Sequence, residues 1–282
     1  AIRVGICTLD EDYLGEFGKG NGTGDGQFVW AVAMALDSQD RLHITDEHSN
    51  RITTYNTSGE YVSHWGTAGA GDGELNGPAG IALDSSGNVF VVDQHNSRVQ
   101  KFTIDGKFIS NWGSQGSAQG ELETPWGICV DNNGDVYVAD WGNNRVQKFS
   151  PDGKFLVQFG SADAKAGDLD HPSGVAVDSE GDVYITDWSN HRVQVYGPDG
   201  KFVTTLVGDA QTPSPWTQTY IDANPDIIKA RRRADMEPEW RFRRPVAVNV
   251  DANDRIFVLE AARHRLQIYN KVKDYEEHSI NL

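Results

Sequence analysis

Short apolar segments with a period of two, separated by turn residues, dominate the hydrophobic pattern of this chain. Residues 125–160 show it most clearly: three alternating segments follow a short apolar one, and the turns between them hold Asp, Asn, Pro and Gly. Alternation with period two predicts β-strands. The segments predict four antiparallel strands, and they read in order "GICVD" (127–131), "DVYVAD" (135–140), "RVQKF" (145–149) and "KFLVQFG" (154–160).

A strand–loop–strand motif recurs along the chain. "VADWGNNRVQKF" (138–149) has counterparts in "VVDQHNSRVQKF" (91–102) and "ITDWSNHRVQVY" (185–196). Its arginine recurs at steps of 47 residues and then once at 73, so that 26 residues are inserted before the last copy: Arg51, Arg98, Arg145, Arg192 and Arg265. A period of 40 to 50 residues with four strands in each unit predicts a β-propeller.

With these copies the chain resembles the NHL-repeat family. The resemblance covers five units, 29–66, 78–113, 125–160, 172–208 and 245–282, of which the last is degenerate. It implies an all-β, NHL-type β-propeller with about six four-stranded blades in one domain, 1–282. It implies no single activity, because function belongs to the site and not to the fold.

The amino-terminal segment matches half of a repeat. Arg3 lies 48 residues before Arg51, and "YLGEFGKGNGTGDGQF" (13–28) parallels "YVSHWGTAGAGDGEL" (61–75). Residues 1–28 therefore predict the outer two strands of a further blade, whose inner two strands have no source in this sequence. Three explanations stay open: residues missing upstream, a ring of five and a half blades, or a rearranged carboxyl-terminal segment.

Charge and hydropathy narrow the classes of partner. The formal net charge of −16 argues against nucleic acid and against anionic membrane surfaces. The longest apolar run, "WAVAMAL" (30–36), is too short to span a bilayer, so we expect a soluble protein without membrane insertion, in a compartment that the sequence does not define.

An acidic residue precedes the loop of every motif copy. These residues are Asp46, Asp93, Asp140, Asp187 and Glu260. Their repetition favours a structural role, in which the carboxylate caps turn amides and meets the motif arginine, because buried carboxylates need such partners. A ring of catalytic acids is the alternative interpretation.

Side chains that differ between the copies are the better candidates for function. Trp141 and Trp188 follow the motif acid, and Trp126 follows the first proline of its unit. His171 and His191 lie in the same loops. These aromatic residues either fill the propeller channel or form a surface that binds a sugar, an aromatic ring or a cation.

A proline-rich insertion, residues 209–244, interrupts the period. It carries seven Lys or Arg and six Asp or Glu residues, and Asn224 followed by Pro225 predicts a helix to about Met236. Because it joins a fourth strand to a first strand, we expect it on the top face, either as a structural clamp or as a lid. The predicted site is one cleft over blades three and four, formed by Trp126, Trp141, Trp188, His171, His191, Asp140, Asp187, Arg231, Arg232 and Trp240.

Two functional classes follow. The first is a non-catalytic propeller that recognises a small molecule or protein on its top face. The second is a lyase or hydrolase, with or without a metal, at the top of the channel. The zinc-binding amidating lyases that resemble this family carry His where first strands begin, but this chain has Val32, Ala79, Trp126, Ser173 and Val246. No cofactor is predicted, and a bound metal ion stays open.

Overall fold

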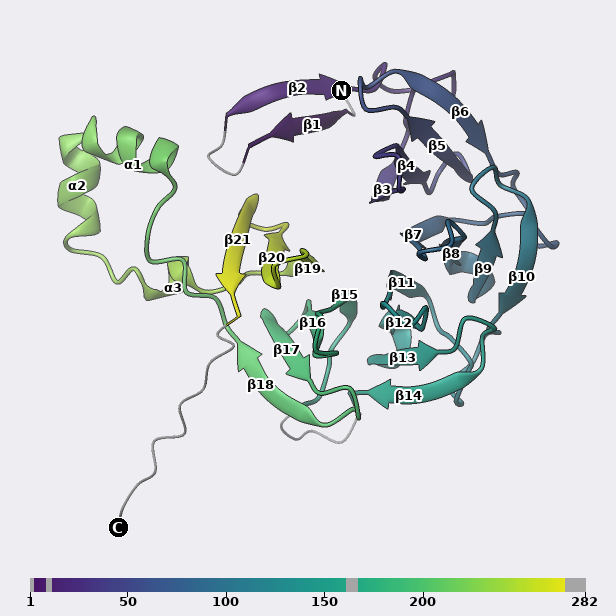
Figure 1. Cartoon of the computed structure of the whole chain (residues 1–282). Helices are drawn as coiled ribbons and strands as arrows, with labels where there is room; N and C mark the ends of the chain where they lie inside the picture. Colours follow the sequence, from purple (N-terminus) through teal and green to yellow (C-terminus); the bar gives the residue numbers. More distant parts are fainter. Residues whose placement is uncertain (1–2, 9–11, 161–166, 272–282) are drawn as a thin grey trace, which may run out of the picture.

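Five antiparallel sheets stand as blades around a common axis (Figure 1). This computed structural model describes residues 3–8, 12–160 and 167–271. Blade one holds β3 (Ala31–Leu36), β4 (Leu42–Asp46), β5 (Arg51–Tyr55) and β6 (Tyr61–Trp65), and blade two holds β7 (Pro78–Leu83), β8 (Val89–Asp93), β9 (Arg98–Phe102) and β10 (Phe108–Trp112). Blade three holds β11 (Pro125–Val130), β12 (Val136–Asp140), β13 (Arg145–Phe149) and β14 (Phe155–Phe159), and blade four holds β15 (Pro172–Val177), β16 (Val183–Asp187), β17 (Arg192–Tyr196) and β18 (Phe202–Leu206). Blade five holds β19 (Pro245–Val250), β20 (Arg255–Glu260) and β21 (Arg265–Asn270).

Tight hairpins join the strands as the turn chemistry predicts. Between β11 and β12 the Gly134 amide donates to the Asp131 carbonyl at 2.9 Å, with a φ of 83° at Gly134. Only glycine adopts this left-handed conformation without strain. The Asp131 carboxylate accepts from the Asn133 and Asp135 amides at 2.9 and 3.0 Å, which closes the turn.

The hydrophobic core lies between the blades. Val92 and Val99 of blade two pack with Val136 and Val138 of blade three, and all four are fully buried. The first strands contact one another around the axis in the order β3, β7, β11, β15 and β19. A side chain at Gly127 would come within 2.5 Å of the Ser173 carbonyl oxygen, so glycine sets how closely blades three and four approach.

A separate two-stranded sheet lies at the rim. It consists of β1 (Val4–Cys7) and β2 (Tyr13–Phe17), and Figure 1 shows it outside the axis, between blades five and one. The Phe17 ring packs against Tyr55 of blade one at a centroid distance of 5.0 Å. The sheet matches the outer half of a repeat unit. The fourth strand expected of the last unit falls in residues 272–282, outside the described residues.

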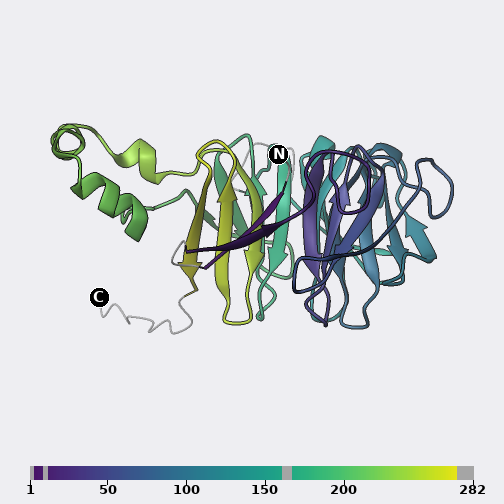
Figure 2. The ribbon, with the colours of Figure 1, turned by 90° about the horizontal axis from the view of Figure 1, so that it is seen from above.

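The insertion contains three short helices, of which the first two project away from the ring and the third lies beside β21. They are α1 (Pro215–Asp222), α2 (Pro225–Arg231) and α3 (Glu237–Trp240) (Figures 1 and 2). The helix expected at Pro225 begins there but ends five residues early. The sequence signal of α1 was overlooked: the Ser214 hydroxyl accepts from the Thr217 amide, with proline directly after the cap. In the described part of the chain, no helix has the length and hydropathy needed to cross a membrane.

The β1–β2 sheet should be the part of the ring that opens most easily. Within the described residues β1 pairs with β2 alone, whereas β13 pairs on both sides. Amide hydrogen exchange measured by NMR or mass spectrometry should show β1 and β2 exchanging faster than β12 and β13. Equal protection would contradict this description of the rim.

Candidate functional site

A buried carboxylate ends the second strand of every blade. Each of the five is fully buried, and each accepts a backbone N–H from the segment that leads into its own first strand: Asp46, Asp93, Asp140, Asp187 and Glu260. In blades two to five the carboxylate also forms an ion pair with the motif arginine. In blade one, Arg51 donates to the carbonyls of Thr23, Gly24 and Gln27.

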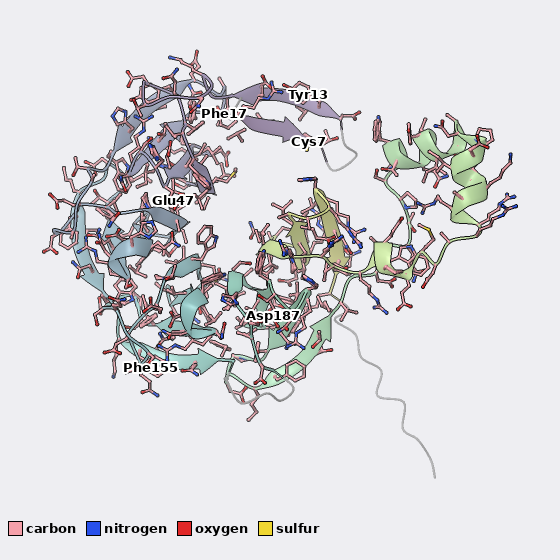
Figure 3. The ribbon with its side chains drawn as sticks, turned by 180° about the vertical axis from the view of Figure 1, so that it is seen from behind. Cys7, Tyr13, Phe17, Glu47, Phe155 and Asp187 are labelled. Atoms are coloured by element: carbon pink, nitrogen blue, oxygen red, sulfur yellow. The ribbon has the colours of Figure 1, made fainter. Side chains whose placement is uncertain are left out.

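Asp140 shows how completely these groups are satisfied. Its carboxylate accepts from the Glu123 amide at 2.7 Å, the Asn143 amide group at 3.0 Å and Arg145 Nε at 2.7 Å. Burial raises the pKa of the Asp140 carboxyl, and the same cause raises the pKa of Asp187. The oxygens of Asp140 and Asp187 are thus engaged inside their blades (Figure 3 shows Asp187 within blade four).

A second contact joins blades one, three and four to the blade that follows each of them. The residue before the motif arginine adopts a left-handed φ of 50–58° in all five blades, and in these three its side chain accepts the amide N–H that precedes the next first strand. Asn50 accepts from Gly77 at 2.8 Å, and Asn144 accepts from His171 at 2.8 Å. His191 Nδ1 accepts from the Arg244 amide at 3.2 Å. We call these contacts the latches.

The latches bring Trp141 and His171 together. The two rings lie 4.0 Å apart between centroids, although they belong to neighbouring blades. His171 Nδ1 also contacts the Asp170 carboxylate and lies 3.2 Å from the Ser189 hydroxyl. Both rings are partly exposed, so this pair presents an aromatic and a titratable group on one surface.

Trp188 repeats this arrangement one blade further on. The Arg244 guanidinium lies over its ring at 4.7 Å from the centroid, a cation–π contact. Arg244 and His191 are exposed, and Arg243 beside them is exposed as well. We call Trp141, His171, Trp188, His191 and Arg244 the arc. The arc lies on the face that carries the loops between blades.

Trp126 lies among the inner strands and not in the arc. It is the second residue of β11 and packs, partly buried, against a core cluster of blades two and three that contains Ala79. Val32 of blade one packs against the same cluster.

The expected single cleft is not formed, because the insertion is bound to blade five. Arg265 donates to the carbonyls of Glu239, Trp240 and Arg241, just as Arg145 donates to loop carbonyls in blade three. These hydrogen bonds from Arg265 hold α3 beside β21. The preceding helix α2 and the arginines at its end, Arg231 and Arg232, therefore extend outward, away from blades three and four (Figures 1 and 2). Trp240 lines a separate cavity of about 440 Å³ between β18 and α3, together with Leu206, Arg241 and Tyr269.

In blade one the buried side chains of Asp37, His43 and Thr54 form a hydrogen-bonded relay. The relay resembles a catalytic triad, but its role is structural. His43 Nε2 lies 3.0 Å from Asp37, and its Nδ1 lies 3.0 Å from the Thr54 hydroxyl. His43 is 1% exposed, and burial lowers its pKa. In blade three the equivalent Tyr137 hydroxyl donates to the equivalent Asp131 at 3.0 Å. The relay therefore replaces a repeated structural contact and has no access to substrate.

No grouping of three or more His, Cys, Asp or Glu side chains that could hold a metal ion occurs within residues 3–8, 12–160 and 167–271. His95 and Glu47, from neighbouring blades, approach to 3.7 Å on the same face as the arc.

Arg244 is the site residue that the sequence reading missed. It precedes Pro245 as His171 precedes Pro172, so an alignment of the residues before each first strand identifies it.

Five sheets stand radially around one axis, and each has a buried carboxylate at the end of its second strand. This arrangement defines a β-propeller. A family model for the NHL repeat matches residues 75–102, 122–149 and 169–196. The matches cover parts of blades two, three and four, in the register set by the motif arginine. The chain therefore carries three NHL repeats within a β-propeller.

Comparisons with solved structures show the same fold at low identity. A streptogramin B lyase structure matches with a TM-score of 0.60 and 14% identity, covering 96% of this chain and 77% of that one. A catalytically inactive virginiamycin B lyase from Staphylococcus aureus with quinupristin matches at 0.55 and 14%, covering 87% and 71%. A nidogen/laminin complex matches at 0.56 and 19%, covering 86% and 80%. No curated protein matches.

Removing one latch should destabilise the ring measurably. Asn144→Gly deletes the acceptor for the His171 amide while keeping the left-handed backbone free of strain. Ser97→Gly, at the equivalent position with a φ of 52°, controls for the gain in backbone freedom. Urea denaturation should show Asn144→Gly losing about 1 kcal/mol more than Ser97→Gly. Equal losses would show that the latch adds nothing to stability.

Proposed function

We propose that this protein is a non-catalytic NHL-repeat propeller, built on six sectors, that recognises a small molecule or protein on its top face through the arc. The observation that carries the proposal is a pair of contacts between loops of neighbouring blades, the tilted ring contact of Trp141 with His171 and the cation–π contact of Trp188 with Arg244. They differ from blade to blade, yet the repeated latches hold them on a rigid frame. Conformational order before binding reduces the entropic cost of binding.

The chemistry of the arc favours a ligand with an anionic group beside an aromatic or apolar one. Arg243 and Arg244 place two exposed cations on a chain of net charge −16. Arg244 lies over one face of Trp188 and is exposed, so its guanidinium can pair with a ligand carboxylate. The partly exposed Trp141 ring offers stacking area to an aromatic side chain. An acidic peptide segment with aromatic residues fits both requirements.

The five motif carboxylates already form hydrogen bonds inside their blades, and this favours a binding function over a catalytic one. A general acid or base must reach the proton that it transfers, but the five motif carboxylates are fully buried and bonded within their blades. The second candidate, a lyase or hydrolase at the top of the channel, has lyases among the structures of similar fold, and a likeness at 14% identity carries the fold alone.

Alanine substitution in the arc should weaken binding without unfolding the protein. Short synthetic peptides rich in Asp, Glu, Phe and Tyr, displayed as an array, serve as probes. Peptides that bind the unmodified chain should lose about 1–3 kcal/mol of binding free energy with Trp141→Ala and with Trp188→Ala, measured by calorimetry.

The matched control is Trp216→Ala, because Trp216 is 71% exposed on α1 of the insertion, outside the ring. Peptides whose affinity falls as much with Trp216→Ala as with the arc variants would refute the assignment. So would an array on which no acidic, aromatic peptide binds.

A further inference from the structure

Blade one exposes an apolar face that is buried or partly buried in the other blades. Met34 of β3 is 54% exposed, whereas the residues at the equivalent position of blades two, four and five, Ile81, Val175 and Val248, are at most 9% exposed. In blade two this position packs against blade one, its predecessor in the ring. Met34, and Leu36 beside it at 60%, therefore face the sector that precedes blade one.

Blade five exposes the complementary face. Leu266 of β21 is 49% exposed, whereas Ile52, Val99, Val146 and Val193 at the equivalent position are fully buried. Leu259 and Ile268 are 44% and 40% exposed. Their counterparts in blade two, such as Val92 and Val99, pack against the following blade. Leu259, Leu266 and Ile268 therefore face the sector that follows blade five. We call the space between these faces the open sector.

The rim sheet closes only the outside of the open sector. In the complete blades the third strand pairs with both the second and the fourth strands, but β1, at the third-strand position, pairs within the described residues with β2 alone. The edge of β1 that points towards the axis is a template for one more antiparallel strand.

Arg3 lacks the partner that its position in the repeat calls for. It begins the third-strand segment as Arg98 and Arg145 do, and those two pair with the acid that ends a second strand at 2.7 Å. Arg3 pairs instead with Glu16 of the neighbouring β2, in an ion pair whose two side chains are 56% and 39% exposed. A carboxylate at the end of an added second strand would restore the repeated pair.

His264 lies where a latch begins. It precedes Arg265 with a left-handed φ of 50°, as His191 precedes Arg192 and accepts the Arg244 amide. Its side chain is exposed. Its position matches an acceptor for the backbone N–H that leads into a sixth first strand.

We propose that the open sector binds a β-hairpin with the sequence pattern of the first half of a repeat of this chain. The first strand would cover Met34 and Leu259 near the axis. The second strand would pair with β1 and end in a carboxylate against Arg3, and the amide before the first strand would meet His264. A second copy offers no such combination in residues 3–8, 12–160 and 167–271, because its own apolar faces lie on separate blades and not on a free hairpin.

A peptide of residues 168–187 tests this proposal. It holds the latch amide, both strands and the terminal Asp187 of blade four. We expect saturable binding to the intact chain by fluorescence anisotropy and slower hydrogen exchange in β1. Leu266→Lys should weaken binding at least about tenfold. Val203→Lys is the matched control, because Val203 is equally apolar, 57% exposed and located on β18.

The charged pair gives an independent readout. The peptide variant Asp187→Asn should bind several-fold more weakly to the unmodified chain and no more weakly to Arg3→Gln, since the two changes remove one interaction. Absence of saturable binding, or equal weakening by Leu266→Lys and Val203→Lys, would overturn the proposal. A chain that dimerises by sedimentation, with the dimer broken by Leu266→Lys alone, would assign the sector to a second copy instead. None of these results depends on the arc.

Discussion

The pairing of a fully buried carboxylate with an arginine at the top of blades two to five is the interaction on which the rest of this structure depends. A carboxylate removed from water must be hydrogen-bonded and paired. Asp140 meets this requirement through a backbone amide, an asparagine and Arg145, each from a different part of the blade. One group thus fixes the second strand, the following loop and the entry to the first strand.

This constraint separates the positions that hold the frame from those that are free to vary. Once the acid and arginine are fixed, the residue after the acid projects from a loop of defined shape. It is Glu47, Gln94, Trp141, Trp188 or Ala261 in the five blades. The latch from Asn144 or His191 then places the residue before the next proline against it. The backbone geometry around the arc thus recurs from blade to blade, whereas the side chains of the arc differ from those at the equivalent positions of the other blades.

The same contacts explain what the sequence could and could not predict. Strand positions, the hairpin turns and the pairing of Asp140 with Arg145 follow from local pattern and from repetition, so the fold was predictable. The direction of the insertion was not, because it depends on Arg265 reaching carbonyls of residues 239–241, a contact distant in sequence. The position of Trp240 in a separate cavity follows from that contact.

The site was predictable in part. Trp141, Trp188, His171 and His191 could be selected because they break the repeat. The structure brings Trp141 to His171, and it joins Trp188 and His191 to Arg244. Trp126 breaks the repeat as well but lies among the inner strands, where it packs against a core cluster of blades two and three. Pattern alone does not distinguish a side chain that faces solvent from one that packs among the inner strands.

The central claim, that the repeated acids and arginines hold the frame, is tested most directly by the free energy of unfolding of Arg145→Ala compared with Arg3→Ala. Arg145 pairs with a fully buried carboxylate, and its removal should cost about 3–5 kcal/mol. Arg3 holds the same place in the repeat but pairs with an exposed Glu16, and its removal should cost less than about 1 kcal/mol. Equal costs for the two variants would contradict this account.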